Sequence, residues 1–355
     1  MSEVQTWGLI GYGNIGREVV RQLGQPEVAE RLNLSTLPEF VVRSSGIMKP
    51  DGETPTDIPT LDYLDELPDV TFIATPSSDD GAEAYDYIST ILHDGKTVVT
   101  AEKGALANRF KDLKEKSENF ERLGINATVG GGTRMLGVAK EYAMDPDNMR
   151  QIHLAFNGTL TSIFSAIAPP EGSGMSLGQA VHQAVQLNYA EPGAESPYDV
   201  IRGEATGDIP KKTSIFFNSV GLGNNPDNLL STHDLSFTLG EQDIANVIEE
   251  AKVRRFIVSM YPEKFLHKAV SCPEQDIIGG FEVHHEGWLI VGGFRHLHRN
   301  PLFHTIGNLT GPGNAMVIGL GPDETDGVYA VTGPGAGVRP TVNTMIDDYV
   351  KRAKV

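Results

Sequence analysis

Apolar residues in the first third of the chain form short runs separated by stretches with helical spacing. The runs, which are typical of buried parallel strands, occupy residues 6–10, 40–45, 69–77 and 96–103. Between them, for example at residues 81–95, apolar side chains recur every three or four positions. Strands that alternate with helices predict right-handed crossovers and a doubly wound parallel sheet, so we expect an α/β fold.

The pattern changes in the remainder of the chain. Residues 151–167 mix strand and helix signals. Helices are expected at 176–190, 209–220 and 243–256, and strands at 254–261, 279–287 and 287–296. We therefore predict a second, α+β domain at residues 136–309. The first domain, residues 1–135, is completed by residues 310–355, which end in a glycine turn and a helix that packs back on it.

Charge excludes one broad class of partner. The formal net charge of −18 would repel a phosphate backbone, so we expect a small metabolite as partner and no nucleic acid. The first residues lack the basic start, apolar run and cleavage site of a signal peptide. No apolar stretch approaches the roughly 18 residues that span a bilayer. We therefore expect a cytoplasmic protein without a membrane segment.

A G-x-G-x-x-G motif joins the first predicted strand to the first predicted helix, with its glycines at Gly11, Gly13 and Gly16. Glycines at this spacing allow a tight turn, close approach of the backbone to a pyrophosphate, and close helix packing, while N–H groups of the helix face the anion. With Asn14 and Ile15 they form a candidate dinucleotide site in a Rossmann-type domain. A glycine turn that binds no ligand is the alternative.

The end of the second predicted strand bears on which dinucleotide binds. An acidic residue there would hold the ribose 2′-hydroxyl of NAD, but the chain has Arg43, Ser44 and Ser45. An arginine beside hydroxyl groups suits the additional 2′-phosphate of NADP, so the pattern favours NADP over NAD. The alternative is that Arg43 simply ends in solvent.

Five sequence blocks occur in an order typical of one enzyme family. They read VVTAEKGALA, FNGTLTSI, LNYAEPG, GDIPKKTSI and TGPGAGVRPTVNTMIDDYV. In this ordered combination the sequence resembles the homoserine dehydrogenases over nearly its whole length. The resemblance implies an NAD(P)-dependent oxidoreductase of threonine and methionine biosynthesis that interconverts L-homoserine and L-aspartate 4-semialdehyde by hydride transfer. It also implies a homodimer whose second domain binds the substrate and forms the dimer contact.

The resemblance implies two catalytic lysines and an aspartate. Asp208 and Lys212 match the family's D-x-x-x-K segment, and on a helix this spacing places both charges on one face, where each orients the other. Lys212 would donate a proton to the aldehyde oxygen and accept one in the oxidative direction. Lys103 matches the lysine of the family's T-A-N-K segment and would share the proton transfer. Glu102 replaces the asparagine that precedes this lysine in the family, and its charge could alter the pKa of Lys103. The alternatives are that Asp208 and Lys212 form a surface ion pair without a function, and that Lys103 is a solvated lysine at a strand end.

Two further blocks imply the substrate contacts. Tyr189 and Glu191 match the family's G-Y-x-E segment and would hold the amino acid, with Glu191 facing its ammonium group. The adjacent substrate loop corresponds to Asn157, Gly158 and Thr159. The stretch that follows Glu191 is longer than is usual in the family, which leaves the contacts from that stretch open.

Two turns complete the candidate cofactor residues. Thr75 and Pro76 would lie beside the nicotinamide at a strand end, although a structural turn explains Pro76 equally well. Gly335, between Gly333 and Gly337, resembles the family's terminal turn, which approaches the cofactor. A turn that only opens the last helix is the alternative.

We expect no functional metal. Where the family has E-A-x-V-x-x-G-x-P, this chain reads NATVGGGTR, so Asn126 replaces a glutamate that contributes to a monovalent-cation site and Arg134 replaces the proline. Without that carboxylate a hard cation should bind weakly, and activity should ignore added sodium or potassium. Five histidines raise a metal hypothesis, but no matched cysteine or carboxylate spacing accompanies them. They are His284, His285, His296, His298 and His304.

Two rival functions stay open. A related dehydrogenase of another small amino or hydroxy acid is permitted by the altered loop at Asn126 and the longer segment after Glu191, and substrate profiling separates it. A non-catalytic NADP-binding sensor would bind the cofactor without turning over an aldehyde. Lys103, Glu191, Asp208 and Lys212 together argue against a sensor, which has no need of these groups in combination.

Overall fold

The chain folds into two compact units. The computed structural model describes residues 3–61, 64, 66–143, 148–190, 193–268, 276–321 and 327–352. The first unit contains residues 1–128 and 338–355, and the second contains residues 129–337. Each unit has its own sheet, and the two are described separately.

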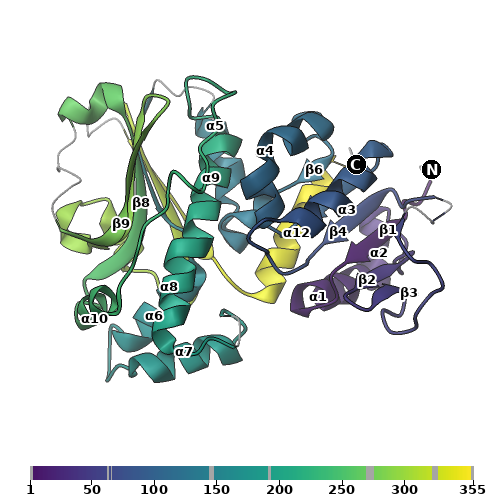
Figure 1. Ribbon diagram of the computed structural model, residues 1–355, viewed down its shortest axis with the longest axis horizontal. Coiled ribbons are helices and arrows are strands. Elements are labelled where there is room, and N and C mark those ends of the chain that lie inside the picture. The colour runs from purple at the N-terminus through teal and green to yellow at the C-terminus, as the bar shows by residue number, and fades with distance from the viewer. Residues whose placement is uncertain are drawn as a thin grey trace. The chain divides into compact units, whose positions relative to one another are not determined.

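A six-stranded sheet forms the centre of the first unit (Figure 1). Its strands lie in the order β3-β2-β1-β4-β5-β6, and every neighbouring pair is parallel except β2 and β3. Their bounds are β1 Trp7–Ile10, β2 Val41–Arg43, β3 Gly46–Met48, β4 Val70–Ile73, β5 Thr97–Thr100 and β6 Leu123–Gly124. The order reverses between β1 and β4, whose carboxyl ends mark the crevice where such a sheet binds its ligand. The predicted doubly wound parallel fold is confirmed.

Helices flank this sheet in two groups. Their bounds are α1 Asn14–Leu23, α2 Pro26–Leu32, α3 Ala82–His93, α4 Gly104–Lys116, α12 Val338–Arg352 and the 3-10 helix η2 Asn126–Thr128. Helix α12 packs against α1, β5 and β6, whereas α3 packs against α4 and β5. Tyr349 of α12 lies against Phe72 of β4 with ring centroids 6.3 Å apart, and its hydroxyl donates to Leu32 O at 2.9 Å. The last helix therefore packs against the sheet of the first unit.

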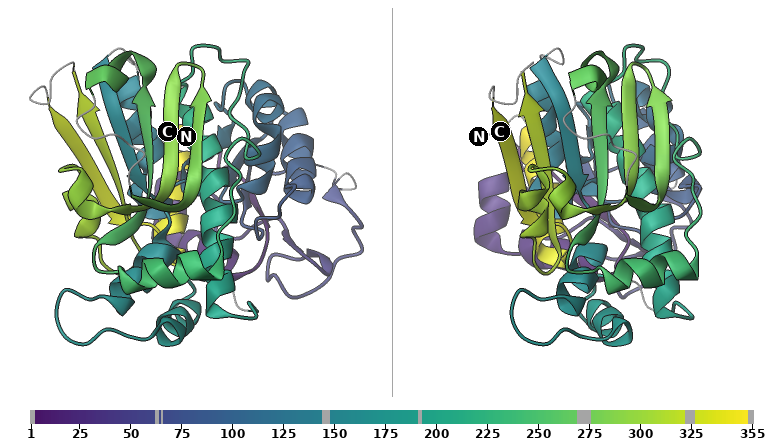
Figure 2. Two further views of the ribbon diagram at one scale, coloured as in Figure 1. Left: turned by 60° about the vertical axis from the view of Figure 1, so that its left-hand side comes forward. Right: turned by 90° about the vertical axis from the view of Figure 1, so that its left-hand side faces the viewer.

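The second unit contains an antiparallel sheet (Figure 2). Its strands lie in the order β12-β11-β7-β8-β10-β9. Their bounds are β7 Met149–Ala155, β8 Arg254–Pro262, β9 Ile277–His285, β10 Trp288–His296, β11 Gly313–Leu320 and β12 Val328–Pro334. The chain returns to the first unit at residue 338 and not at the expected 310, because β11 pairs along its length with β7 and with β12.

Helices cover both faces of the second sheet. Their bounds are α5 Met135–Ala143, α6 Gly158–Ile167, α7 Leu177–Gln186, α8 Pro197–Gly203, α9 Ile209–Val220, α10 Glu241–Glu249 and α11 Phe303–Gly307, with short 3-10 helices η3 Gly131–Thr133, η6 Glu263–Lys268 and η7 Leu297–Arg299. Phe294 of β10 stacks on Phe164 of α6, whereas the guanidinium of Arg295 lies over Phe303 of α11 at 4.9 Å. Successive strand residues point to opposite faces, so α6 and α11 lie on opposite sides.

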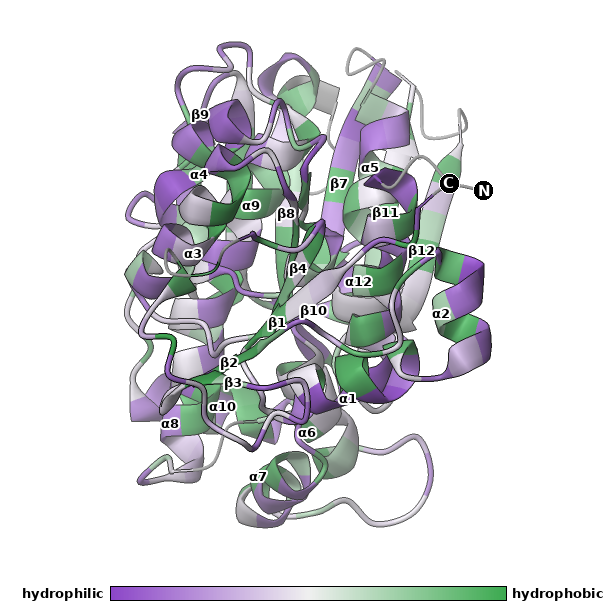
Figure 3. Ribbon diagram, turned by 90° about the vertical axis from the view of Figure 1, so that its right-hand side faces the viewer, coloured by the Kyte–Doolittle hydropathy of each residue, from purple (hydrophilic) through white to green (hydrophobic). Residues whose placement is uncertain are grey.

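Hydropathy follows this layering. Figure 3 shows hydrophobic colour along the central strands β1 and β4 of the first sheet, where all residues are buried. On the helices, hydrophobic and hydrophilic colours share one element, as expected for helices that cover a sheet with one face. Within the described parts of the chain, no helix combines the length and apolar character needed to cross a membrane.

Candidate active site

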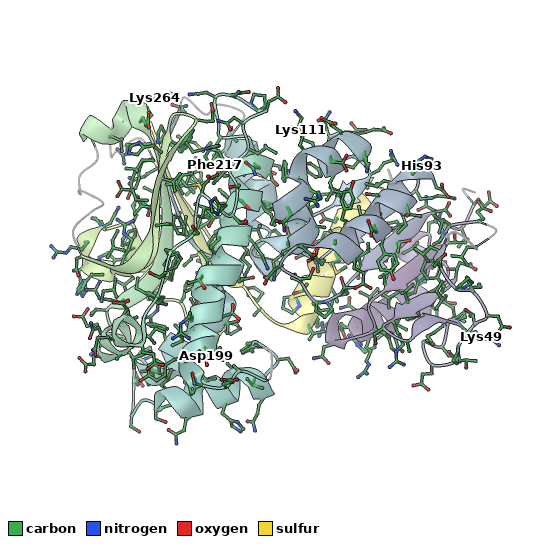
Figure 4. The ribbon with its side chains drawn as sticks, in the orientation of Figure 1. Lys49, His93, Lys111, Asp199, Phe217 and Lys264 are labelled. Carbon is green, nitrogen blue, oxygen red and sulfur yellow. The ribbon has the colours of Figure 1, made fainter. Side chains whose placement is uncertain are left out.

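A continuous helical column in the second unit carries the predicted catalytic pair. It consists of α8, a π-helical segment η5 at Glu204–Asp208, and α9. Figure 4 labels Asp199 near the beginning of this column and Phe217 in α9. Pro210 stands early in α9, where its missing N–H would interrupt an ordinary helical ladder, and a π segment precedes it. Such segments are rare and often occur at functional sites.

Lys212 and Asp208 form a mostly buried ion pair on this column. Lys212 Nζ lies 2.6 Å from Asp208 Oδ2, and the two side chains are only 11% and 16% exposed. Lys212 Nζ also donates to the carbonyl of Phe156 at 3.0 Å, which fixes the ammonium from a second direction. The pair is therefore not a solvated surface ion pair. The geometry favours the prediction that the ammonium of Lys212 is held in a fixed orientation.

Asn157 connects this pair to the beginning of α6. Its Oδ1 accepts from Leu160 N at 2.8 Å and caps the helix, while its Nδ2 donates to Asp208 Oδ2 at 2.9 Å. The same Nδ2 lies 2.5 Å from Glu204 Oε2. Asn157 thus orients Asp208 and, through it, Lys212. Glu204 is a residue that the sequence analysis does not single out, although its place four residues before Asp208 offers a signal.

The predicted substrate loop and the tyrosine segment lie together. Thr159 Oγ1 donates to Tyr189 O at 2.5 Å, which ties the first turn of α6 to the chain that follows α7. Glu191, the predicted partner of the substrate ammonium, lies outside the described residues. The structure therefore places Asn157, Thr159 and Tyr189 in one neighbourhood.

The terminal glycine turn lies against the same helix end. Gly335 N donates to Pro312 O at 2.7 Å, and a Cβ added at Gly158 would lie 2.9 Å from that carbonyl oxygen and 2.8 Å from Ala336 N. Gly158 therefore has no room for a side chain. Beside this turn the fully buried amide of Asn314 has no hydrogen-bond partner among the described residues on either side-chain atom. Asn314 is not among the residues predicted from the sequence.

The three glycines of the dinucleotide motif differ in what surrounds them. Gly11 has φ +93°, and a Cβ there would lie 2.6 Å from Ala74 C; a Cβ at Gly16 would lie 1.9 Å from Gly11 O. Around Gly13, in contrast, no atom of the described residues lies within 4 Å of an added Cβ. Gly11 and Gly16 are required by the fold itself, whereas Gly13 leaves open space before α1, which begins at Asn14 without an acidic residue in its first turn.

The end of β4 lies beside this turn. Thr75 and Pro76 follow β4 after Ala74, and a Cβ at Gly11 would lie 2.7 Å from Thr75 N. The hydroxyl of Thr75 is buried, and no residue in the described part of the chain forms a hydrogen bond with it. A buried polar atom of this kind at a strand end is a candidate ligand contact.

Arg43 stands at the end of β2 and takes part in an aromatic cluster. Its guanidinium lies 5.6 Å from the ring centre of Tyr12 and donates to Gly52 O at 3.1 Å. The guanidinium of Arg17, in α1, lies 5.7 Å from the same ring. Arg43 makes these two contacts but is exposed, as is Ser44, which follows it. Tyr12 and Arg17 are not singled out by the sequence analysis.

Glu102 caps a helix beside Lys103. Its fully buried carboxylate accepts from Gly104 N at 2.5 Å and from Ala105 N at 2.9 Å, at the beginning of α4. Burial raises the pKa of this carboxyl, although the amide hydrogen bonds and the charge of Lys103 act in the opposite direction. Lys103 itself follows β5, and its N–H donates to Ser77 Oγ at 3.1 Å. The replacement of asparagine by Glu102 therefore provides a cap for α4.

We expect Glu102→Gln to remove a pH-dependent part of the stability. The pKa of Glu102 is raised in the folded protein, so at pH values between the ordinary carboxyl pKa and this raised pKa the folded protein binds more protons than the unfolded chain. The free energy of unfolding of the wild type therefore falls as the pH rises through this interval. The unfolding temperature of the wild type minus that of Glu102→Gln should therefore decrease between about pH 4 and about pH 8. The exposed Glu39→Gln serves as control, and a difference that is flat or increasing with pH contradicts the expectation.

Asn126 binds a carboxylate from the C-terminal helix. Its N–H donates to Asp348 Oδ2 at 2.7 Å, and its side-chain amide donates to the other oxygen of that carboxylate. Arg352 Nη1 lies 3.2 Å from the same carboxylate, which is 1% exposed on the side chain. Asp348 is thus engaged by an amide and a guanidinium. Arg134, at the end of η3, adopts φ +55°.

The histidines do not form a metal cluster in the described part of the chain. His284 Nδ1 lies 2.7 Å from Glu263 Oε1, and His285 Nε2 lies 3.0 Å from Asn228 O. No group of three or more histidine, cysteine, aspartate or glutamate residues that could hold a metal ion occurs among the residues described.

Each unit therefore gathers a distinct part of the predicted site. The second unit brings together Asn157, Gly158, Thr159, Tyr189, Asp208, Lys212 and Gly335. The first unit brings together Gly11, Gly13, Asn14, Ile15, Gly16, Thr75 and Pro76, with Arg43 and Ser44 at the end of β2 and Lys103 at the end of β5.

Comparison with known proteins identifies relatives. The homoserine dehydrogenase family model matches residues 137–350. The homoserine dehydrogenase of Emericella nidulans is 28% identical over 240 residues, which cover 61% of this chain and 62% of that protein. The homoserine dehydrogenase of Mycobacterium leprae is 24% identical over 99% of this chain and 74% of its own. The match therefore spans less than two thirds of the Emericella protein.

Solved structures share the fold. The homoserine dehydrogenase of Thermoplasma acidophilum superposes with a TM-score of 0.70 at 20% identity, over 99% of both chains. A hyperthermophilic archaeal homoserine dehydrogenase in complex with NADPH superposes with a TM-score of 0.63, also at 20% identity, over 99% of this chain and 98% of its own.

Proposed function

Because the chain belongs to the homoserine dehydrogenase family, we propose that it catalyses the NADP-linked interconversion of L-homoserine and L-aspartate 4-semialdehyde. The observation that carries this proposal is the Asp208–Lys212 pair, held by Asn157 and the carbonyl of Phe156. The ammonium of Lys212 would donate a proton to the aldehyde oxygen as the hydride arrives, and the neutral amine that results would accept the hydroxyl proton in the reverse direction. Lys103 shares this proton transfer.

The residues around Gly13 fit a dinucleotide. The open space at Gly13 and the first turn of α1, with Asn14 and Ile15, would hold the pyrophosphate at a helix N-terminus. The unpartnered hydroxyl of Thr75, followed by Pro76, would bond to the carboxamide of the nicotinamide. The dinucleotide, when bound, supplies or accepts the hydride. These residues bind and orient it.

Residues of the second unit would hold the amino acid. Asn157, Gly158 and Thr159 present the first turn of α6, to which Tyr189 is tied. Glu191 would face the substrate ammonium, and Gly335 would border the cofactor. We further propose a cytoplasmic homodimer whose activity does not depend on sodium or potassium.

The experiment that tests the function is NADP-linked oxidation of L-homoserine by the purified full chain, followed by absorbance of the reduced cofactor. The proposal expects turnover with L-homoserine that exceeds turnover with L-serine, L-threonine and 4-hydroxybutyrate. Faster turnover of one of those alcohols would establish a related dehydrogenase. Cofactor binding without turnover of any of them would establish a sensor.

Cofactor choice provides a prediction for Arg43. A charge-assisted hydrogen bond to the 2′-phosphate stabilises the complex by roughly 1.5–3 kcal/mol, so Arg43→Ala should lower kcat/KM for NADP by roughly 10- to 100-fold. Activity with NAD, which lacks the phosphate, should change by less than about twofold. Arg17→Ala should act in the same direction, because both guanidinium groups lie on the ring of Tyr12.

The matched control for this prediction is Arg21→Ala. Arg21 lies in the same helix as Arg17 but pairs with Glu18 at 2.6 Å. If the ratio of kcat/KM for NADP to kcat/KM for NAD is the same in wild type, Arg43→Ala and Arg17→Ala, neither arginine contributes to cofactor recognition.

A further inference from the structure

The aromatic ring of Tyr12 contacts two guanidinium groups at once. Tyr12 is a residue of the dinucleotide motif itself. The guanidinium of Arg43, at the end of β2, lies 5.6 Å from the ring centre, and that of Arg17, in α1, lies 5.7 Å from it. Both distances are within the range of a cation–π contact. Strand β2 brings Arg43 to this place because it runs parallel to β1, and Gly11 N donates to Val42 O at 2.9 Å.

These two guanidinium groups have no carboxylate partner among the described residues. Arg21, one turn beyond Arg17 in the same helix, shows the usual arrangement, because it pairs with Glu18 at 2.6 Å. Apart from the ring, Arg43 donates to the carbonyl of Gly52 at 3.1 Å. Both side chains are exposed, so a ligand can reach them. An anion that binds here would meet two positive charges that no described carboxylate neutralises.

A short loop after β3, residues 49–54, supports the ring from another side. A Cβ added at Gly52 would lie 2.6 Å from Tyr12 Cζ, so the ring packs directly on the backbone of this glycine, whose φ of +72° other residues rarely adopt. The carboxylate of Asp51 closes the loop by accepting from Thr54 N at 2.8 Å and from Thr54 Oγ1 at 2.5 Å. The hydrogen bonds from Thr54 lower the pKa of Asp51 to about 2, so this carboxylate stays ionised. The loop therefore fixes the glycine on which the ring lies.

Such a ring changes what an arginine loses when it binds an anion. A free arginine side chain samples many rotamers, and the loss of this freedom on binding weakens the complex. A side chain that is already held in place before the anion arrives loses less. Because Tyr12 contacts both Arg17 and Arg43, one ring orders two cationic groups in advance.

We propose that Tyr12 is a positioning residue for cofactor specificity: it holds Arg17 and Arg43 in place for the 2′-phosphate of NADPH and so favours NADPH over NADH. The inference rests on the proposed binding of a dinucleotide at Gly13, and it does not depend on which alcohol the protein oxidises. Guanidinium groups match a phosphate with a planar set of donors, and the 2′-phosphate is the group that distinguishes the two dinucleotides. The two guanidinium groups and Gly52 contact the aromatic ring, so phenylalanine should serve in place of tyrosine.

Isothermal titration calorimetry of the full chain with NADPH and with NADH, in the absence of substrate, tests the proposal. Tyr12→Leu should weaken NADPH binding by at least about fivefold and change NADH binding by less than about twofold, because only the 2′-phosphate uses the two arginines. Tyr12→Phe should keep both affinities within about twofold of wild type, because it retains the ring. Tyr329→Leu changes an exposed tyrosine of β12 and should alter neither affinity.

The ratio of the two dissociation constants separates positioning from a merely structural role. If Tyr12→Leu weakens NADPH and NADH equally, the ring only supports the glycine turn and the proposal is overturned. Equal affinity of the wild type for NADPH and NADH overturns it as well. A preference for NADPH that Tyr12→Leu reduces supports the proposal even if L-homoserine is not oxidised. Conversely, oxidation of L-homoserine with a preference that Tyr12→Leu leaves unchanged overturns the proposal and not the reaction.

A second variant keeps the test decisive if Tyr12→Leu does not fold. Tyr12→Met fills more of the space of the ring with a flexible chain that has no aromatic face for the two guanidinium groups. It should reduce the preference for NADPH by at least about fivefold, as expected for Tyr12→Leu. A preference equal to that of wild type in folded Tyr12→Met would overturn the proposal.

Discussion

Lys212→Met will lower kcat for L-homoserine oxidation by at least about 1000-fold while changing NADP affinity by less than about twofold. Lys212 pairs with Asp208 and donates to the carbonyl of Phe156, and its neutral amine is the proposed proton acceptor in this direction. Loss of a positioned acid–base group removes stabilisation of the transition state and not of bound cofactor, so the effect should fall on kcat. Steady-state kinetics and fluorescence titration with NADPH measure the two quantities.

Two controls accompany this variant. Removal of the ammonium leaves the partly buried Asp208 carboxylate without its partner, so the double variant Lys212→Met with Asp208→Asn separates lost chemistry from lost stability. Lys211→Met changes the adjacent lysine in the same helix and should retain activity. A Lys212→Met protein that keeps more than about one tenth of the wild-type kcat would exclude Lys212 as the proton-transfer group.

Gly13→Val will weaken NADP binding by at least about 100-fold without lowering the unfolding temperature. Nothing lies within 4 Å of a Cβ at Gly13, so the folded chain has room for the side chain. The same space is where the pyrophosphate is proposed to approach the backbone, and a side chain there would keep it away. Affinity is measured by fluorescence titration and stability by thermal unfolding.

Comparison within the same motif makes this result specific. Gly16→Ala places a Cβ 1.9 Å from Gly11 O and should lower stability as well as binding. Gly178→Val also enters open space, but in α7 of the second unit, and should affect neither. If Gly13→Val bound NADP within about threefold of wild type, the proposed pyrophosphate position would have to be abandoned.

The acid–base pair illustrates how much one hydrogen-bonding residue can organise. Asn157 uses its oxygen to cap α6 and its nitrogen to hold Asp208 and Glu204. Two elements distant in sequence, α6 and η5, therefore meet at a single amide. A change at Asn157 would disturb the helix cap and the pair together, which is why Lys212 is the sharper probe of chemistry.

Local spacing predicted much of the fold. The apolar runs that predicted strands correspond to β1, β2, β4 and β5, and helix α9 has the predicted bounds, Ile209–Val220. Strands β11 and β12 show the limit of this approach. Strand β11 joins the second sheet through hydrogen bonds to β7, a strand about 160 residues earlier, and β12 joins it by pairing with β11. No local pattern encodes the pairing of β11 with β7.

The candidate site likewise has some features that local spacing predicts and others that it does not. Spacing alone predicted that Asp208 and Lys212 share a helix face, because four residues make about one helical turn. The spacing did not reveal that the pair is mostly buried, that Asn157 and Glu204 join it, or that Tyr12 lies against two arginines. Those facts depend on which distant segments pack together.

The sequence by itself determined the glycine turn, the alternation of strands and helices in the first domain, and the placement of Asp208 and Lys212 on one helix face, since each depends on backbone preference and side-chain period over a few residues. Only the tertiary structure decided that Gly13 faces open space while Gly11 and Gly16 are enclosed, and that Glu102 caps α4 from a fully buried position. The reason is physical: free space, burial and electrostatic environment at one residue are set by atoms supplied from remote parts of the chain.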